Sequence, residues 1–137
     1  MLRRIILAVD GSEPSRRASE FAGRLALDTH SEVVVLHVRE TEVTYAGAFP
    51  LETPDAAEEF VDTEVRRLKN QGVSARGEVV PALYGRASRV ILEIADTEGA
   101  DMVVMGSRGR SDLAGLVLGS VTHKVIHLAH CPVLLVR

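Results

Sequence analysis

The fold of this chain is constrained most by a regular alternation of short apolar runs with amphipathic helical segments. Continuous apolar runs of this length are typical of strands buried on both faces of a parallel sheet. The five runs are Ile5–Val9, Val33–Val38, a weaker one at Ala75–Val80, Met102–Met105 and Val133–Val136. Between them, apolar residues recur with the helical period, as at Ala18, Phe21, Ala22 and Leu25. The pattern therefore predicts strand and helix in strict alternation.

Alternating strands and helices predict one three-layer α/β domain over residues 1–137, with helices on both faces of a parallel sheet. Right-handed crossovers leave few arrangements, and we expect a Rossmann-like five-stranded sheet of order 3-2-1-4-5. In that order the switch point lies between strands 1 and 4, where ligands bind in α/β sheets. The loops at this point are Asp10–Pro14, with Ser12 as helix N-cap, and Gly106–Gly119.

The second of these loops has an unusual glycine pattern. The stretch MGSRGRSDLAGLVLGSV (105–121) places Gly106, Gly109 and Gly119 between a strand and a helix, with Ser120 directly after the last glycine. Glycine lets backbone N–H groups approach an anion closely, and the N-terminus of the following helix favours negative charge. The spacing G-x2-G-x9-G-S fits neither the dinucleotide fingerprint nor the Walker A loop. The spacing predicts a phosphate-binding loop of another kind. It lies at the crevice that the strand order also predicts.

Composition bears on two questions: which partners the chain can bind, and in which cell compartment it works. The chain has 137 residues and a net charge of −3, so nothing points to nucleic-acid binding. The apolar run near the N-terminus is too short for a signal peptide, and no stretch reaches membrane-spanning length. The single cysteine, Cys131, suits a reducing compartment. We expect a protein of the cytoplasm.

One connection is long for a compact domain. The stretch from Glu40 to Pro54 leaves the end of the second strand, beside the expected crevice. Connections of this length are usually functional or disordered. Two interpretations stay open for it: a lid over the crevice and a mobile surface loop.

The whole chain resembles the universal stress protein family, in its ATP-binding branch. The resemblance rests on five segments: IILAVDGSEPS, VVVLHV, ADMVVMGSRGRS, GLVLGSVTHKVI and CPVLLV. The G-x2-G-x9-G-S/T pattern is that branch's nucleotide motif and is complete here. In register with a strand, a helix and the other segments, it is a far more specific signal than a short glycine pattern alone.

The resemblance implies ATP as ligand, with Mg or Mn, and it implies roles for ten residues. Asp10 corresponds to the acidic residue beside the ribose and the metal-bound phosphates, so its metal contact is indirect. Val38 corresponds to the residue whose main chain contacts the edge of the adenine, and Ala8 corresponds to a residue that lines the base pocket. The remaining positions, against the ribose or along the phosphates, are Met105, Gly106, Arg108, Gly109, Gly119, Ser120 and Val121.

Each of these residues also has a purely structural interpretation. Asp10 can serve as a cap for the helix that starts near Pro14, and Arg108 and Arg110 can be solvated loop charges. His37 lies within an apolar strand, which favours a hydrogen-bonded core histidine over a ligand. His123, His127 and His130 have a spacing that can bind metal, yet a solvated helix face explains them better.

Three classes of function compete. The first is an ATP-binding regulatory or stress-response protein that signals through conformation or partner binding. The second is a slow ATPase or phosphotransferase, weakened because the chain has no P-loop lysine and no G-x-S-x-G. The third is a nucleotide-free interaction protein, disfavoured by the complete glycine motif. A homodimer through the apolar edge strand Val133–Val136 is expected, because an exposed edge invites pairing and family members commonly dimerise there.

Overall fold

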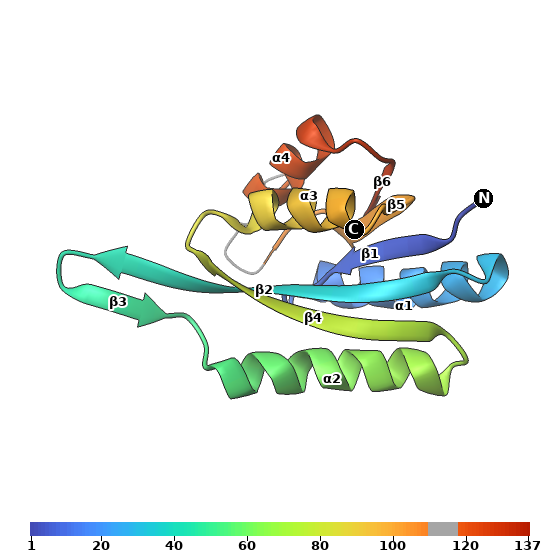
Figure 1. Ribbon diagram of the computed structural model, residues 1–137, viewed down its shortest axis with the longest axis horizontal. Coiled ribbons are helices and arrows are strands. Elements are labelled where there is room, and N and C mark those ends of the chain that lie inside the picture. Colours follow the sequence, from blue (N-terminus) through green and yellow to red (C-terminus); the bar gives the residue numbers. More distant parts are fainter. Residues whose placement is uncertain (110–117) are drawn as a thin grey trace.

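The computed structural model describes residues 1–109 and 118–137 and contains one α/β domain (Figure 1). Its elements are β1 (Arg4–Ala8), α1 (Glu13–Thr29), β2 (Glu32–Thr44), β3 (Gly47–Pro50), α2 (Pro54–Asn70), β4 (Ser74–Leu83), α3 (Ala87–Thr97), β5 (Met102–Gly106), α4 (Ser120–Leu128) and β6 (Val133–Val136). The five expected strands pair in parallel in the order β4-β2-β1-β5-β6, as the sequence predicts. The sixth strand, β3, pairs antiparallel with β2 and was not expected.

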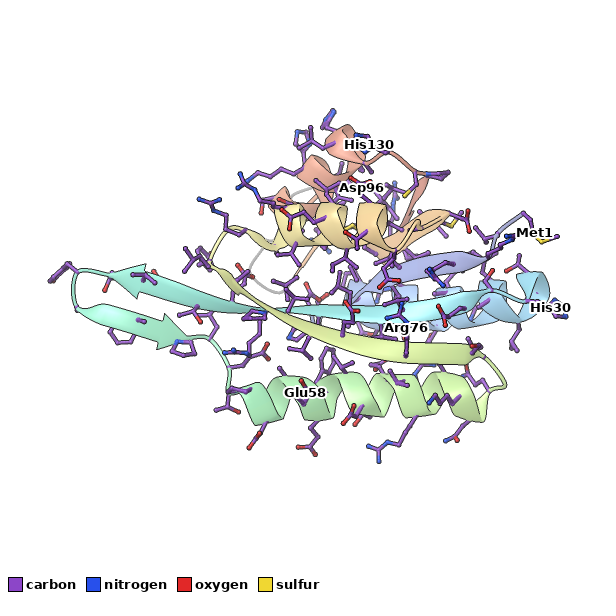
Figure 2. All side chains as sticks on the ribbon, in the orientation of Figure 1. Met1, His30, Glu58, Arg76, Asp96 and His130 are labelled. Atoms are coloured by element: carbon purple, nitrogen blue, oxygen red, sulfur yellow. The ribbon has the colours of Figure 1, made fainter. Side chains whose placement is uncertain are left out.

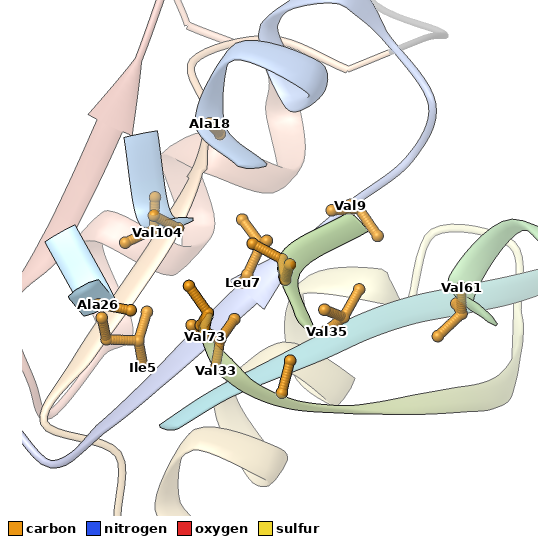
Figure 3. Packing of buried hydrophobic residues seen from close by; sticks show 13 residues of the cluster. Ile5, Leu7, Val9, Ala18, Ala26, Val33, Val35, Val61, Val73 and Val104 are labelled. Carbon is orange, nitrogen blue, oxygen red and sulfur yellow. The ribbon is translucent and has the colours of Figure 1, made fainter. Parts of the chain in front are cut away.

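Two apolar clusters, one on each face of the sheet, hold the layers together. Ile5, Leu7 and Val9 pack with α1 and α2, whereas Ile6 and Ala8 belong to the cluster under α3 and α4. Figure 3 shows the first of these clusters, to which β1, β2, α1 and α2 contribute. Successive residues of a strand point to opposite faces, so a strand covered on both sides must be apolar throughout. This is why the strand runs show no alternation of polar and apolar residues.

The stretch 40–54 forms a β-hairpin instead of an irregular loop, which corrects the sequence-based expectation. β2 continues to Thr44, and β3 returns along it with Val43 opposite Ala48 and Thr44 opposite Gly47. The residues from Val43 to Tyr45 favour extended backbone, and Gly47 has φ +130°, which supports the sharp turn. Figure 1 shows this hairpin projecting from the body of the protein.

The two ends of the sheet differ in chemistry. At the amino ends of the strands, Arg76 of β4 forms ion pairs with Glu98 at 2.5 Å and Glu78 at 3.2 Å (Figure 2). Arg4 pairs with Glu32 at 3.0 Å in the same region. Half-exposed pairs of this kind contribute little stability each. The carboxyl ends of the strands carry a pocket instead.

Candidate functional site

A pocket of about 370 Å³ opens at the carboxyl ends of β1 and β5, which is the expected switch point. The adjacent strands β1 and β5 lead there into the two predicted loops. Eight of the ten residues singled out from the sequence line this pocket: Ala8, Asp10, Val38, Met105, Gly106, Arg108, Gly109 and Val121. The structure therefore brings these eight residues together at the place that topology and motif both predicted.

The floor of the pocket is apolar and belongs to the core. Ala8 stands opposite Leu36 on one side and Met105 on the other, in the register of three adjacent strands. Their exposed fractions are only 9%, 1% and 5%. Ile91 of α3 and Val121 of α4 add further apolar surface. A floor of this kind suits a flat apolar group such as a nucleobase.

Asp10 shapes the first loop without capping the helix. Its Oδ1 accepts a hydrogen bond from the Ser12 backbone N–H at 2.9 Å. Ser12 is the N-cap of α1 and its hydroxyl accepts from the Ser15 N–H at 3.2 Å, as the sequence predicts. Ser15 Oγ in turn accepts from the Asp10 N–H at 3.0 Å. The loop is thus tied by local bonds that leave the half-buried Asp10 on the pocket wall.

Gly106 has a packing role in addition to its place in the pocket. A Cβ atom at this position would lie 2.8 Å from the Pro14 carbonyl carbon, the Pro14 Cβ and the Ser15 nitrogen. No side chain fits at such distances, so glycine here lets the start of α1 approach the end of β5. The sequence argument weighed Gly106 as a ligand position or a turn glycine and missed this packing contact.

The N-terminus of α4 stands beside the pocket. Gly119 is its N-cap and is buried, and its N–H donates to the Ser107 carbonyl at 2.9 Å. Thr122 Oγ1 donates to the Gly106 carbonyl at 2.9 Å, which ties the helix to β5. Val121 and Thr122 line the pocket, whereas Gly119 and Ser120 are not among its lining residues. Residues 110–117, including Arg110, lie outside the described part of the chain.

The rim of the pocket contains residues that the sequence argument missed. Glu40, Leu51, Glu52 and Tyr84 line it from the base of the hairpin and the end of β4. Tyr84 directly follows the end of β4, so the rule that sites gather at carboxyl ends could have found it. Glu40 lies within β2, beyond the last residue that pairs with β1. No such signal existed for Glu52, which reaches the pocket only because β3 folds back along β2.

His37 is buried and hydrogen-bonded, as expected, and it also belongs to the pocket wall. Its Nδ1 lies 2.8 Å from the Val9 carbonyl, and its Nε2 contacts Glu52 Oε1. A carbonyl only accepts hydrogen bonds, so Nδ1 must carry a proton. Phe60 packs edge-on against the ring, with centroids 5.1 Å apart.

The histidines of α4 are exposed, in line with a solvated helix face. The rings of His123 and His127 contact each other edge-on, with centroids 4.4 Å apart. His130 instead lies 3.2 Å from Asp96, through Nδ1. Among the described residues, no three His, Cys, Asp or Glu side chains gather as a metal site would need.

Comparison with known proteins decides the family. The model of the Universal stress protein family matches residues 1–137. This chain belongs to the universal stress protein family. A universal stress protein of Bacillus subtilis (strain 168), YxiE, is 34% identical over 150 residues, with 100% of both chains covered.

Solved structures of universal stress proteins share the fold. The structure of hypothetical protein MJ0577 has a TM-score of 0.78 and 26% identity, covering 99% of this chain and 96% of the other. A universal stress protein in complex with cAMP has a TM-score of 0.71 and 26% identity, with coverage of 99% and 97%. In the described residues of this universal stress protein, no helix has the length and hydropathy to cross a membrane.

Proposed function

We propose that this protein binds ATP together with a divalent cation and acts as a stress-response regulator through conformation or partner binding. The observation that carries the proposal is the two-ended pocket at the switch point. One end is the apolar floor around Ala8 and Met105; the other has Asp10, Arg108 and the start of α4. An adenine group fits the first end, and phosphates fit the second. A relative that binds cAMP supports the adenine-nucleotide class.

The groups at the polar end suit a cation held mainly by phosphates. Asp10 contributes one carboxylate, and one of its oxygens is engaged by Ser12. Mg²⁺ is commonly bound through one or two carboxylates plus substrate phosphates, so this donor set is adequate for MgATP. The cation would neutralise phosphate charge; Asp10 and the α1 loop would orient it.

Calorimetric titration with MgATP tests the proposal directly. We expect saturable binding that weakens when the metal is chelated. Asp10→Asn keeps the acceptor for the Ser12 N–H but removes the charge, so it should reduce the metal dependence. Asp28→Asn, on the exposed end of α1, is the matched control. Lack of binding at millimolar nucleotide would refute the proposal and favour a nucleotide-free interaction protein.

The rate of phosphate release distinguishes the proposed regulator from the alternative, a slow ATPase or phosphotransferase. Among the described residues of the polar end, none is placed as a general base, so we expect phosphate release well below the ~1–10³ s⁻¹ of ordinary enzymes. Mass analysis of nucleotide released from denatured protein adds an independent readout. Bound ATP supports a regulator. Bound ADP, together with turnover above about 1 s⁻¹ that disappears in Asp10→Asn, would establish an enzyme instead.

A homodimer through β6 is part of the proposal. β6 pairs with β5 along one side, and no described strand pairs with its other side. Its residues Val133, Leu134, Leu135 and Val136 are apolar and half-buried. Antiparallel pairing of two copies about a two-fold axis would cover this edge. Leu135→Lys should shift the sedimentation of the protein toward smaller species; no shift would place the interface elsewhere.

A further inference from the structure

The hairpin tip extends beyond every other element of the sheet. We call residues 42–51 the arm, and each of them is exposed. β1 ends opposite Leu36, and β4 ends opposite Thr41, so the arm has no neighbouring strand on either side within the described chain. Figures 1 and 2 show it standing clear of the body with its side chains in solvent.

The arm exposes more large apolar side chains than a solvent-exposed hairpin needs. Val43 is 62% exposed, Tyr45 is fully exposed, and Phe49 and Leu51 are 50% and 56% exposed. Leu83 and Tyr84 continue the apolar surface at the base of the arm. These six residues are most of the large hydrophobic side chains exposed in the described part of the chain. A contiguous exposed patch of this kind marks an interaction site.

The backbone of the arm is equally unprotected. Beyond Thr41, β2 pairs only with β3, and β3 pairs only with β2. Open strand edges attract further chains unless lysines, prolines, bulges or covering loops block them. The arm contains no lysine, and its one proline, Pro50, stands at the end of β3. Apolar side chains and free edges both indicate that another polypeptide covers it.

The charge of the arm restricts what that polypeptide can be. The one charged residue of the arm is Glu42, and the acidic residues Glu40 and Glu52 stand on either side of the arm in the sequence. Contact between two arms would bring like charges together. A complementary surface exists on the same chain at the turn from β4 to α3. There Leu83 and Tyr84 stand beside Arg86 and Arg89, which are exposed and form no ion pair with a described residue.

We infer that the arm of one copy docks on the β4–α3 turn of a second copy. The second copy returns the contact, which makes a two-fold interface separate from the β6 edge. Phe49 and Tyr45 supply the apolar contact, and Glu42 faces the arginines. The interface does not depend on a nucleotide, so it stands or falls independently of the proposed function.

Sedimentation velocity of the full-length Leu135→Lys protein, at tens of micromolar and low salt, isolates this interface from β6. We expect a dimer. Adding Tyr45→Ser and Phe49→Ser should convert it to a monomer. The matched control is Phe21→Ser with Leu27→Ser, an exposed aromatic and an exposed aliphatic on α1, which should leave the dimer intact. Circular dichroism checks that every variant remains folded.

A monomer in the Leu135→Lys background overturns the inference, and so does a dimer that the arm substitutions leave unchanged. The charge argument has its own test. Arg86→Glu with Arg89→Glu should weaken the dimer at least about tenfold, and raising NaCl to about 0.5 M should weaken it as well. If neither change weakens the dimer, the arm does not dock on this turn. Calorimetry with MgATP, run on the same samples, reports separately on the proposed function.

Discussion

The floor and the rim of the pocket are built in different ways, although both line the same cavity. The floor residues Ala8 and Met105 lie in adjacent strands near the centre of the sheet, with apolar side chains packed below them. The rim is attached by few contacts. Glu40 accepts from the Gly85 N–H at 2.9 Å, the Leu51 N–H donates to the Glu40 carbonyl at 3.0 Å, and Glu52 contacts His37.

This difference assigns different functions to the two regions. Burial from both faces makes the floor a fixed shape, which suits recognition of a ligand. The rim has a low density of buried contacts and belongs to the segment that leads into the arm. Segments with few buried contacts open locally at low cost, and regulatory elements are drawn from them. Under the proposed function, the rim is the region that would transmit ligand occupancy at the lowest cost.

The comparison is tested most strongly by a matched pair of leucines. Leu36 lines the floor and is 1% exposed, whereas Leu51 lines the rim and is 56% exposed. We expect Leu36→Ala to lower the free energy of unfolding by about 2–5 kcal/mol. Leu51→Ala should change it by no more than about 0.5 kcal/mol. Urea denaturation of both variants measures the contrast, and equal losses would mean that rim and floor form one rigid unit.

The floor should dominate ligand affinity. Ala8→Leu places three further carbon atoms against the pocket, so we expect the affinity for MgATP to fall by about 100-fold, or 2.7 kcal/mol. Ala56→Leu, on the exposed side of α2, is the control and should leave the affinity unchanged. Calorimetry measures both. If Ala8→Leu binds normally, the base lies elsewhere in the pocket.

The Glu52–His37 contact is the strongest attachment of the rim. Glu52→Ala leaves the buried His37 Nε2 without its partner, and we expect a loss of about 1–2 kcal/mol in unfolding free energy. Glu59→Ala, exposed on α2, is the control and should change the unfolding free energy by no more than about 0.5 kcal/mol. Urea denaturation measures both variants, and equal small losses would show that the Glu52–His37 contact does not hold the rim.

The smallest expected effect is a difference in ATP affinity between a tyrosine substitution in the rim and one in the arm. Tyr84 lines the pocket, whereas Tyr45 lies at the arm tip and is fully exposed. Removing an aromatic contact costs about 0.5–1.5 kcal/mol, so Tyr84→Ala should weaken ATP binding by about 3–10-fold. Tyr45→Ala should leave it unchanged in protein dilute enough to be monomeric. Equal effects of the two substitutions would show that the arm tip reaches the ligand.

The sequence alone determined the sheet order, the place of the pocket and most of its floor. Strands buried on both faces must be apolar throughout, and parallel strands joined by right-handed crossovers leave few orders. The glycine motif then pointed to the same crevice. These rules are local or topological, because they act within one strand and the loop that follows it. Single residues such as Ala8 and Met105 were named through the resemblance to the universal stress protein family, not through these rules.

Only the tertiary structure decided the rim, the arm and the second role of Gly106. Glu52 reaches His37 because a hairpin brings residue 52 back beside residue 37, a distance along the chain that no short pattern encodes. Gly106 is required by the approach of Pro14, which lies in another element. The stretch 40–54 is a hairpin because β2 extends beyond the strands on either side of it, and the chain then turns back and pairs with β2 as β3. Contacts between segments distant in sequence depend on packing geometry, and that geometry exists only in the folded chain.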